Sequence, residues 1–494
     1  MEPYRFEHIT YAYPGEEKPA VEDVSFTVQP GEFIVVCGAS GSGKTTLLRQ
    51  IKERHSAFGF VMQNPRTQTV TDTVGHELAF GMENKGIRPD NMWHAIAETT
   101  TYFGMQDWLD RAVYELSGGE LQLVNLAAVL LLDPNVILLD EPTAQLDPMA
   151  ATEFLEIVKR LNTQFGITVI LIEQRLEEVL AACDRMLVLY EGRIAAFDTV
   201  RGVYEKICRS ELSAEYLSYM PSYVRLYAGV NESADECPQS IKECRNWFYG
   251  TNVELSVIKK EKSKLTGACS LACRDVYFRY ERTGPDILKG IQFRAYPGHI
   301  YGIVGGNGSG KSTFLKVLTG AKRHYHGKIT VDGEMAYLPQ EPKYMFLQDR
   351  VRDVISDRQV VEDFGLEELL DRHPYDVSGG QMQRVAMAYL CEKQASVYLF
   401  DEPTKGLDPR WKQMFGAWLE KLAGEGKTVI VVTHDVEFAA NYCEWMSMCF
   451  RSELTEPMRT SEFLNEHYFY TTAIHKITRD KYPHLVSERS LYET

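Results

Sequence analysis

The sequence predicts an α/β protein made of two tandem domains of the same kind. Phosphate-binding loops of the pattern G-x-x-x-x-G-K-[ST] occur at residues 38–45 and 305–312. Each loop follows an apolar, β-rich run and precedes a helical pattern, which is the order that phosphate binding requires. Later motifs repeat at a constant offset, because 378 − 117, 401 − 140 and 408 − 147 all equal 261. A repeat of this length indicates a duplicated domain and not a solenoid.

The two glycine-rich loops are the first candidate sites. Glycines let backbone N–H groups approach phosphate oxygens, and the helix N-terminus that follows favours negative charge. An isolated match could be an ordinary turn before a helix, but the strand–loop–helix context argues against that interpretation. The lysines are expected to reach the terminal phosphates, and Thr45 and Ser312 to ligate Mg²⁺. The predicted binding residues are Gly38, Ala39, Ser40, Gly41, Ser42, Gly43, Lys44, Thr45 and Thr46, and Gly305, Gly306, Asn307, Gly308, Ser309, Gly310, Lys311, Ser312 and Thr313.

Two adjacent acids end an apolar strand in each copy. The first acid, Asp140 or Asp401, is expected to hold Mg²⁺ at the C-terminal edge of a parallel sheet. The second, Glu141 or Glu402, is expected to polarise the attacking water. An Asp-Glu pair or a Ser-Gly-Gly turn alone is more often structural, but the shared order and offset favour catalysis. The pattern therefore predicts metal-assisted phosphoryl transfer.

With these motifs in order, the chain resembles the ABC ATPase family over nearly its whole length. The resemblance implies two P-loop NTPase domains, each with a RecA-like, mostly parallel sheet, a small antiparallel β region and an α-helical subdomain. It also implies ATP and Mg²⁺ as ligands. Tyr13 and Tyr280 match the aromatic residue that stacks on adenine, and Gln63 and Gln340 match the glutamine that touches Mg²⁺ and the attacking water. His434 matches the histidine that contacts the terminal phosphate.

In that family each ATP lies between the phosphate loop of one cassette and the Ser-Gly-Gly turn of the other. The resemblance therefore implies two composite sites. The first-copy phosphate loop would be completed by Ser378, Gly379 and Gly380, and the second-copy loop by Ser117, Gly118 and Gly119.

Three departures distinguish the first copy from the second. Gln174 stands where the second copy has His434, and an amide cannot carry the charge that an imidazole carries. Leu123 stands where the second copy has Arg384. The spacing from the loop lysine to the glutamine is 63 − 44 = 19 positions against 340 − 311 = 29. We therefore expect a trimmed antiparallel region in the first cassette and faster hydrolysis at the site that contains His434.

Composition limits the cellular role. A formal charge of −16 argues against a nucleic-acid polymer as the main partner. No apolar run approaches the roughly 18–20 residues of a membrane span, and the N-terminus has no signal pattern. These features predict a cytosolic chain. The ten cysteines fit reduced thiols better than a disulfide framework.

The repeat also sets expected domain limits. We expect a first ATP-binding domain at 1–200, an extension and linker at 201–265, a second domain at 266–454 and a C-terminal extension at 455–494. The basic stretch at 259–264 is most simply a solvated connector. Tethering makes association of the cassettes intramolecular, with an effective concentration on the order of millimolar.

The segments around the glutamines suggest a narrower function. Residues 62–84 resemble the Q-N-P-x-x-Q and E-x-A-F-G-x-E-N patterns of energy-coupling factor transporter ATPases, residues 338–355 resemble the second half of fused members, and residues 237–248 resemble their post-cassette segment. The resemblance implies a peripheral ATPase on the cytoplasmic face of the membrane. Its partners would be a transmembrane coupling protein and a small membrane substrate-binding subunit that import a vitamin or metal ion. Two alternatives remain, namely the fused ATPase of a sugar or nucleoside importer and a double-cassette translation factor.

Overall fold

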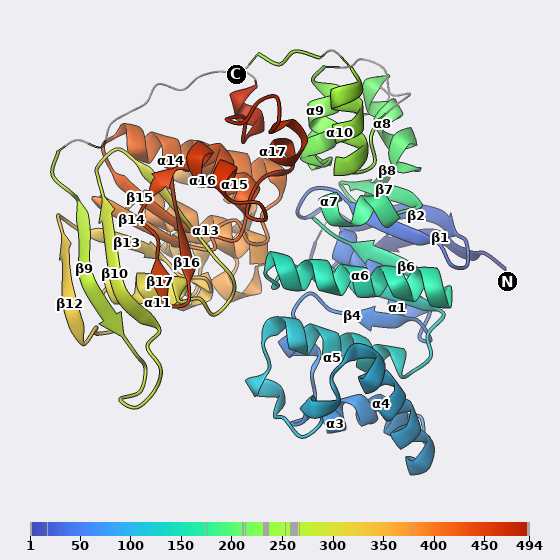
Figure 1. Ribbon diagram of the computed structural model, residues 1–494. Coiled ribbons are helices and arrows are strands. Elements are labelled where there is room, and N and C mark those ends of the chain that lie inside the picture. The colour runs from blue at the N-terminus through green and yellow to red at the C-terminus, as the bar shows by residue number, and fades with distance from the viewer. Residues whose placement is uncertain are drawn as a thin grey trace. The chain divides into compact units, whose positions relative to one another are not determined.

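The structure is a computed structural model that forms two compact units, residues 1–244 and 245–494 (Figure 1). It describes residues 2–16, 18–174, 176–209, 212, 214–230, 237–251, 253–256, 265, 267–377 and 379–491. The basic stretch predicted at 259–264 lies outside the described residues.

A mixed sheet with the strand order β4-β5-β6-β3-β7-β8 forms the core of the first unit. Neighbours are parallel up to β7, and β8 runs antiparallel to β7. The central strands are buried at every residue, as expected for a parallel sheet covered on both faces. A separate antiparallel pair, β1 (Tyr4–Tyr11) and β2 (Val21–Val28), completes the β structure described in this unit. The sheet strands are β3 (Phe33–Cys37), β4 (Gly59–Val61), β5 (Val136–Asp140), β6 (Thr168–Ile172), β7 (Arg185–Tyr190) and β8 (Arg193–Asp198).

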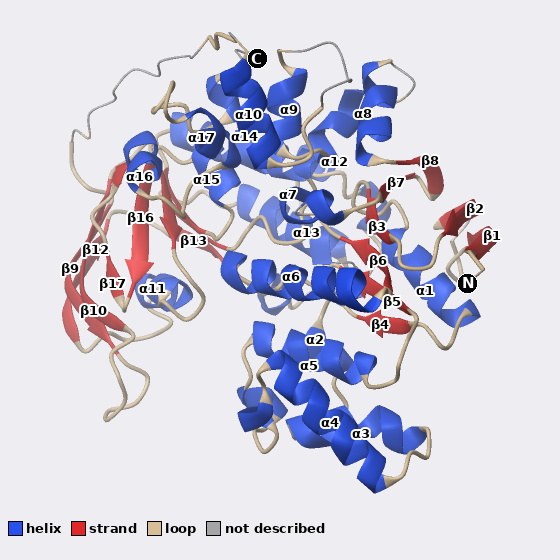
Figure 2. Cartoon of the chain, turned by 45° about the vertical axis from the view of Figure 1, so that its right-hand side comes forward, coloured by secondary structure: helices blue, strands red, loops and turns tan. Residues whose placement is uncertain are grey.

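The helices of the first unit fall into two groups. Helices α2 to α5 gather together, and in both views they lie beside β4, the edge strand of the core sheet (Figures 1 and 2). A cluster of apolar side chains from α3, α4 and α5 gives the group its own core, so it is the expected α-helical subdomain. The helices are α1 (Lys44–Arg54), α2 (Pro65–Gln68), α3 (Val74–Asn84), α4 (Pro89–Phe103), α5 (Gly118–Leu130), α6 (Pro148–Phe165), α7 (Leu176–Val179), α8 (Val200–Cys208), α9 (Ser222–Ala228) and α10 (Ile241–Gly250), whose last residues belong to the second unit.

The second unit repeats this plan. Its main sheet has the order β13-β14-β15-β11-β16-β17, with β18 also paired to β16. Neighbouring strands in this sheet run parallel from β13 through β14, β15 and β11 to β16. The antiparallel sheet has three strands in the order β10-β9-β12. The strands are β9 (Leu271–Phe278), β10 (Leu288–Ala295), β11 (Ile300–Val304), β12 (His326–Val331), β13 (Met335–Leu338), β14 (Val397–Asp401), β15 (Thr428–Val432), β16 (Trp445–Phe450), β17 (Glu453–Leu454) and β18 (Met458–Arg459).

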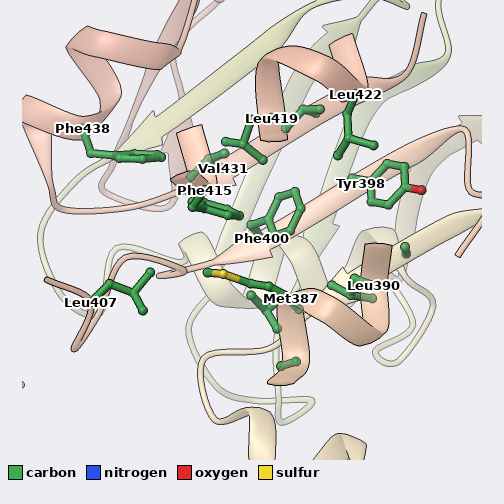
Figure 3. Packing of buried hydrophobic residues seen from close by; sticks show 14 of the residues in the cluster. Met387, Leu390, Tyr398, Phe400, Leu407, Phe415, Leu419, Leu422, Val431 and Phe438 are labelled. Atoms are coloured by element: carbon green, nitrogen blue, oxygen red, sulfur yellow. The ribbon is translucent and has the colours of Figure 1, made fainter. Parts of the chain in front are cut away.

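Aromatic and aliphatic side chains fill the space between that sheet and its helices. Phe400 of β14 packs against Phe415 of α14, with 5.2 Å between the ring centroids. Phe415 in turn stacks on Phe438, with 5.6 Å between the ring centroids (Figure 3). This core fixes the strand ends that carry the acids. The helices are α11 (Lys311–Leu318), α12 (Arg358–Asp363), α13 (Gly379–Cys391), α14 (Pro409–Gly424), α15 (Val436–Tyr442), α16 (Thr460–Glu466) and α17 (Ala473–Thr478).

The two units differ where the spacing predicted a difference. In the second unit β12 and its turns lie between α11 and β13 and add a third antiparallel strand. In the first unit only residues 55–58 separate α1 from β4, which leaves no room for such a strand. The predicted trimming of the first cassette is therefore confirmed.

The C-terminal segment packs on the second unit. Phe463 and Leu464 of α16 are fully buried and join the main hydrophobic core. Tyr468 and Phe469 remain exposed. Within the described residues, no helix has both the length and the apolarity to cross a bilayer.

Candidate nucleotide sites

The first phosphate loop joins β3 to α1. Lys44, the first residue of α1, folds back and donates hydrogen bonds to the carbonyl oxygens of Gly38 and Ala39 at 2.9 and 2.7 Å. Gly38 and Gly43 have φ of 141° and 94°. A Cβ atom at Gly38 would lie 2.1 Å from the Leu189 carbonyl oxygen, so only glycine fits there.

The second phosphate loop has the same geometry. Lys311 donates to the carbonyl oxygens of Gly305 and Gly306 at 2.8 and 2.9 Å. Gly305 and Gly310 have φ of 150° and 109°. A Cβ atom at Gly305 would lie 2.3 Å from the Cys449 carbonyl oxygen. The other predicted loop residues occupy the same turns: Ser40, Gly41, Asn307 and Gly308.

One serine in each loop has an unsatisfied hydroxyl. The Oγ atoms of Ser42 and Ser309 are buried and have no hydrogen-bond partner in the described structure. Buried hydroxyls normally have partners, so each orphan suits an acceptor supplied by a bound phosphate. The loops therefore fit a nucleotide phosphate by backbone shape and by side-chain chemistry.

The first acid of each pair contacts the loop hydroxyl. Thr45 donates to Asp140 at 2.9 Å and Ser312 donates to Asp401 at 2.9 Å. Burial raises the pKa of both carboxyls, to about 6 for Asp401, although the hydroxyl hydrogen bond acts in the opposite direction. Tyr337 also donates to Asp401 at 3.4 Å.

These hydroxyl and carboxylate pairs fit Mg²⁺. Magnesium in nucleotide sites is commonly held by one or two protein oxygens together with substrate phosphates and water, and not by a full protein cage. In keeping with this, the described part of the chain contains no group of three or more His, Cys, Asp or Glu residues suited to a metal. Thr45 with Asp140, and Ser312 with Asp401, are the pairs that would hold the ion.

In the first unit the second acid lies between two amide side chains. Gln63 donates to one carboxylate oxygen of Glu141 at 2.7 Å, and Gln174 donates to the other at 2.8 Å. Glu141 is 9% exposed and has a left-handed φ of 42°, which is strained for a side-chain-bearing residue. Burial raises the pKa of Glu141 to about 7, and the Gln174 hydrogen bond offsets only part of that effect.

In the second unit the matching acid faces an imidazole. Glu402 has a φ of 52° and lies 2.7 Å from Nδ1 of His434, whose backbone N–H also donates to it at 3.2 Å. Burial acts to raise the pKa of Glu402, but the hydrogen bond and charge of His434, together with Lys311, lower it below its usual range. Gln340 lies in the loop after β13.

The two predicted adenine-stacking residues are placed alike. The Tyr13 hydroxyl lies 3.0 Å from the Thr46 hydroxyl, and the Tyr280 hydroxyl lies 3.1 Å from that of Thr313. Tyr13 is 37% exposed and Tyr280 is 55% exposed, so both rings are accessible beside their loops.

The Ser-Gly-Gly turns start helices. Ser117 caps α5 through a reciprocal box with Glu120, and Gly118 and Gly119 are its first helical residues. In the second unit Gly379 and Gly380 begin α13, and Ser378 lies outside the described residues. Pairing of these turns with the phosphate loops of the other unit stays a prediction.

Three contacting residues were missed by the sequence analysis. The hydroxyl of Thr143 donates to the buried carboxylate of Glu173 at 2.6 Å, and that carboxylate also accepts from the backbone N–H of Gln174 at 2.8 Å. Tyr337 is the third. Two sequence features could have indicated these residues. Glu173 is adjacent to Gln174, and Tyr337 lies three residues before Gln340.

Comparisons with known proteins agree with this geometry. The family profile described as ABC transporter matches residues 21–144 and 288–405. A candidate ABC transporter ATP-binding protein of Bacillus cereus is 35% identical over 98% of this chain and 97% of its own length. A candidate HMP/thiamine import ATP-binding protein of Bacillus subtilis is 28% identical over 89% of this chain and 88% of its own length. Among solved structures, an archaeal ribosome recycling factor bound to a ribosomal stalk protein aligns with a TM-score of 0.61 at 21% identity, over 93% of this chain and 91% of that one, which reflects the fold alone.

Proposed function

The chain belongs to the ABC transporter ATPase family and hydrolyses ATP, and from that premise we propose that it energises an energy-coupling factor importer of a vitamin or metal ion. The proposal includes a peripheral position on the cytoplasmic face of the membrane. It also retains the expected domain limits at residues 200, 265 and 454.

One segment of the first unit carries the proposal. Residues 62–84 include Gln63, which contacts Glu141, while Met62, Val70 and Phe80 of the same segment are 38%, 66% and 39% exposed. A segment that touches the reacting centre and also presents apolar side chains suits a docking partner. Its sequence resembles energy-coupling ATPases, and the Bacillus subtilis relative bears the name of an HMP/thiamine import ATP-binding protein.

This segment is also attached to the helix of the Ser-Gly-Gly turn. Gln122 of α5 donates to the Met62 carbonyl at 3.2 Å, and Asn125 of α5 donates to the Pro65 carbonyl at 3.0 Å. Movement of α5 would therefore move the exposed segment. In the proposed mechanism ATP draws the cassettes together, α5 and its counterpart α13 shift, and helices of a transmembrane coupling protein follow.

Each site residue receives a role in this proposal. Lys44 and Lys311 bind terminal phosphates, Glu141 and Glu402 polarise water, and His434 stabilises charge on the leaving phosphate. Gln174 takes the histidine position in the first site and supplies a neutral donor instead. The proposal assigns faster turnover to the site that contains His434.

The test is affinity purification of the tagged chain from mildly solubilised membranes of its own cell, with partners identified by mass spectrometry. Recovery of a polytopic coupling protein and a small membrane subunit is the expected result. Recovery with a periplasmic or lipid-anchored receptor system would point to a sugar or nucleoside importer. Recovery of ribosomes without membrane proteins would overturn transport.

A further inference from the structure

In the second unit, the helix after His434 is tied to the C-terminal segment. Helix α15 starts two residues after His434 and carries Glu437. One carboxylate oxygen of Glu437 accepts a hydrogen bond from the backbone N–H of Ala473 at 2.7 Å. Ala473 is the first residue of α17 and is 5% exposed. The first N–H groups of a helix lack intrahelical partners, and a carboxylate is a favourable acceptor for them.

The first unit contains the same contact at the matching position. Helix α7 starts two residues after Gln174 and carries Glu177. A carboxylate oxygen of Glu177 accepts from the backbone N–H of Ser222 at 3.2 Å. Ser222 is the first residue of α9 and is fully buried. Each glutamate follows its Gln or His by three positions, although α9 and α17 share no sequence motif.

The chain between His434 and Glu437 is held firmly at its start. Asp435 caps α15 by accepting from the Phe438 N–H at 2.9 Å, and Lys412 of α14 donates to its other oxygen at 2.6 Å. Although burial raises it, the pKa of Asp435 falls to about 2 because of the charge and hydrogen bond of Lys412. The turn from His434 to Glu437 is therefore fixed at two points, Asp435 and Glu437, which together set where His434 lies.

The C-terminal segment that holds Glu437 is itself anchored in the unit. Thr472 donates to the Val486 carbonyl at 2.8 Å, and Arg489 forms a two-point pair with Glu420 of α14 at 2.8 and 3.1 Å. Ile474 is fully buried. The segment is thus a rigid support for the α15 contact.

The chain that leads from the first cassette into the second docks on the same support. Arg245 donates to Asp480 at 2.6 Å, and the Leu255 N–H donates to the Tyr482 hydroxyl at 3.0 Å. Lys481 donates to the carbonyl of residue 253 at 2.8 Å. Contacts within the second unit therefore run from the connecting segment through α17 to Glu437 and the His434 turn.

We propose that Glu437 is a positioning residue for His434, and Glu177 for Gln174, so that the segment after each cassette sets the placement of the residue facing the terminal phosphate. The connecting segment and the C-terminal segment are thereby a regulatory input to hydrolysis. This inference rests on the roles proposed above for His434 and Gln174.

The experiment measures kcat and KM for Mg-ATP on the purified full chain. Glu437→Ala is expected to lower kcat about 5-fold or more with KM changed less than about 2-fold, because hydrolysis and not ATP capture depends on His434. Glu437→Gln keeps an acceptor oxygen and is expected to retain kcat within about 2-fold. Glu392→Ala, which removes a carboxylate that accepts from the Ser356 and Asp357 N–H groups at 2.7 Å each, outside the path argued above, is the matched control and should lower Tm with kcat unchanged.

His434→Ala separates the two proposals. If His434→Ala lowers kcat but Glu437→Ala does not, the positioning inference is overturned and the role of His434 stands. If His434→Ala has no effect, the underlying role itself fails. An equal loss of kcat in Glu392→Ala would also overturn the inference, since it would mark general destabilisation. If Glu437→Ala does not fold, Glu437→Asp takes its place, because aspartate withdraws the carboxylate by one methylene. A wild-type kcat for Glu437→Asp would then overturn the positioning inference.

Discussion

The partners of Glu141 and Glu402 explain why two buried carboxylates at matching positions differ in protonation. Burial opposes ionisation of both. The neutral amide of Gln174 offsets only part of this effect and leaves the pKa of Glu141 at about 7, whereas the hydrogen bond and charge of His434 lower the pKa of Glu402 below its usual range. A general base must be ionised before it accepts a proton or orients water. Under the roles proposed above, the second site therefore has an ionised base at neutral pH, and the base of the first site is only partly ionised.

The first prediction concerns single-site activity. Glu402→Gln should abolish most ATP hydrolysis by the full chain, and Glu141→Gln should leave most of it. A missing charge stabiliser of roughly 1–3 kcal/mol slows the chemical step about 5- to 150-fold, so the Gln174 site contributes little turnover. Phosphate release at saturating Mg-ATP measures the effect. Activity that survives Glu402→Gln and disappears in Glu141→Gln would reverse the assignment.

The second prediction is a stability difference that depends on pH. The folded pKa of Glu141, about 7, lies above its ordinary value of 4.5, so its stabilising contribution is present below pH 4.5 and lost as pH rises through 7. The amide introduced by Glu141→Gln cannot ionise, so the variant does not lose this stability as the pH rises. At pH 8 the free energy of unfolding of the variant should be about 1–3 kcal/mol higher than that of wild type. This range already includes the cost of the one amide donor that loses its acceptor in the variant. At pH 5 the two free energies should be nearly equal.

Calorimetric Tm of the nucleotide-free protein measures this difference, and Glu402→Gln is its control. The pKa of Glu402 is lowered in the folded state, so ionised Glu402 stabilises the fold above its ordinary pKa of 4.5. That stabilisation is lost as the pH falls through the lowered, folded-state pKa. Glu402→Gln should therefore lower Tm at pH 8. The same sign of Tm change in both variants at pH 8 would contradict the electrostatic difference.

At the scale of elements, the helical parts of the two units are attached to their cores differently. The Arg384 guanidinium of α13 lies 4.3 Å from the ring centre of Trp411 on α14 and donates to the Phe364 and Gly365 carbonyls at 3.3 Å each. Leu123 stands at the Arg384 position in the first copy, and at the offset of 261 an alanine replaces Trp411. Helix α13 is thus braced against α14 by a cation–π contact that α5, which contains no cationic or aromatic residue, lacks.

The third prediction is that Arg384 and Trp411 act as one stabilising unit. Arg384→Leu and Trp411→Ala should each lower the Tm of the second unit by about 2–4 °C, the shift that roughly 1 kcal/mol causes in a domain of this size. The double variant should be little worse than the poorer single variant. Calorimetry measures all three, with Arg358→Ala on the exposed face of α12 as a control that leaves Tm unchanged. Fully additive losses would show that the pair is not coupled.

Elements whose residues are adjacent in sequence were predictable, and so was the meeting of Thr45 with Asp140 and of Ser312 with Asp401, but the other contacts between distant residues were not. The phosphate loops follow from glycine positions, and the missing third strand of the first unit follows from the 19-residue spacing. Nothing local indicates that Gln63 and Gln174 donate to opposite oxygens of one carboxylate, because 111 residues separate them and packing alone brings them together. The contacts of Glu177 and Glu437 were hidden for the same reason.

For the whole molecule, duplication has left two equipped but unequal phosphate loops in one covalent chain. Each unit holds its own lysine, hydroxyl and acid pair. Tethering gives the partner cassette an effective concentration on the order of millimolar, so weak ATP-dependent closure becomes feasible without a second copy of the chain. ATP drives such closure only through greater affinity for the closed state.

The fourth prediction tests closure through Ser117. Its Oγ accepts from the Glu120 N–H at 3.3 Å, so alanine removes an N-cap worth about 1 kcal/mol, whereas asparagine retains a cap. In a Glu402→Gln background, both Ser117→Ala and Ser117→Asn should bind ATP almost normally but fail to compact on ATP addition, because in the predicted composite site the serine hydroxyl contacts the terminal phosphate. Equilibrium dialysis gives the affinity and small-angle scattering the radius of gyration. If Ser117→Asn compacts normally, α5 capping alone is required; if both variants lose binding and compaction equally, the composite site is wrong.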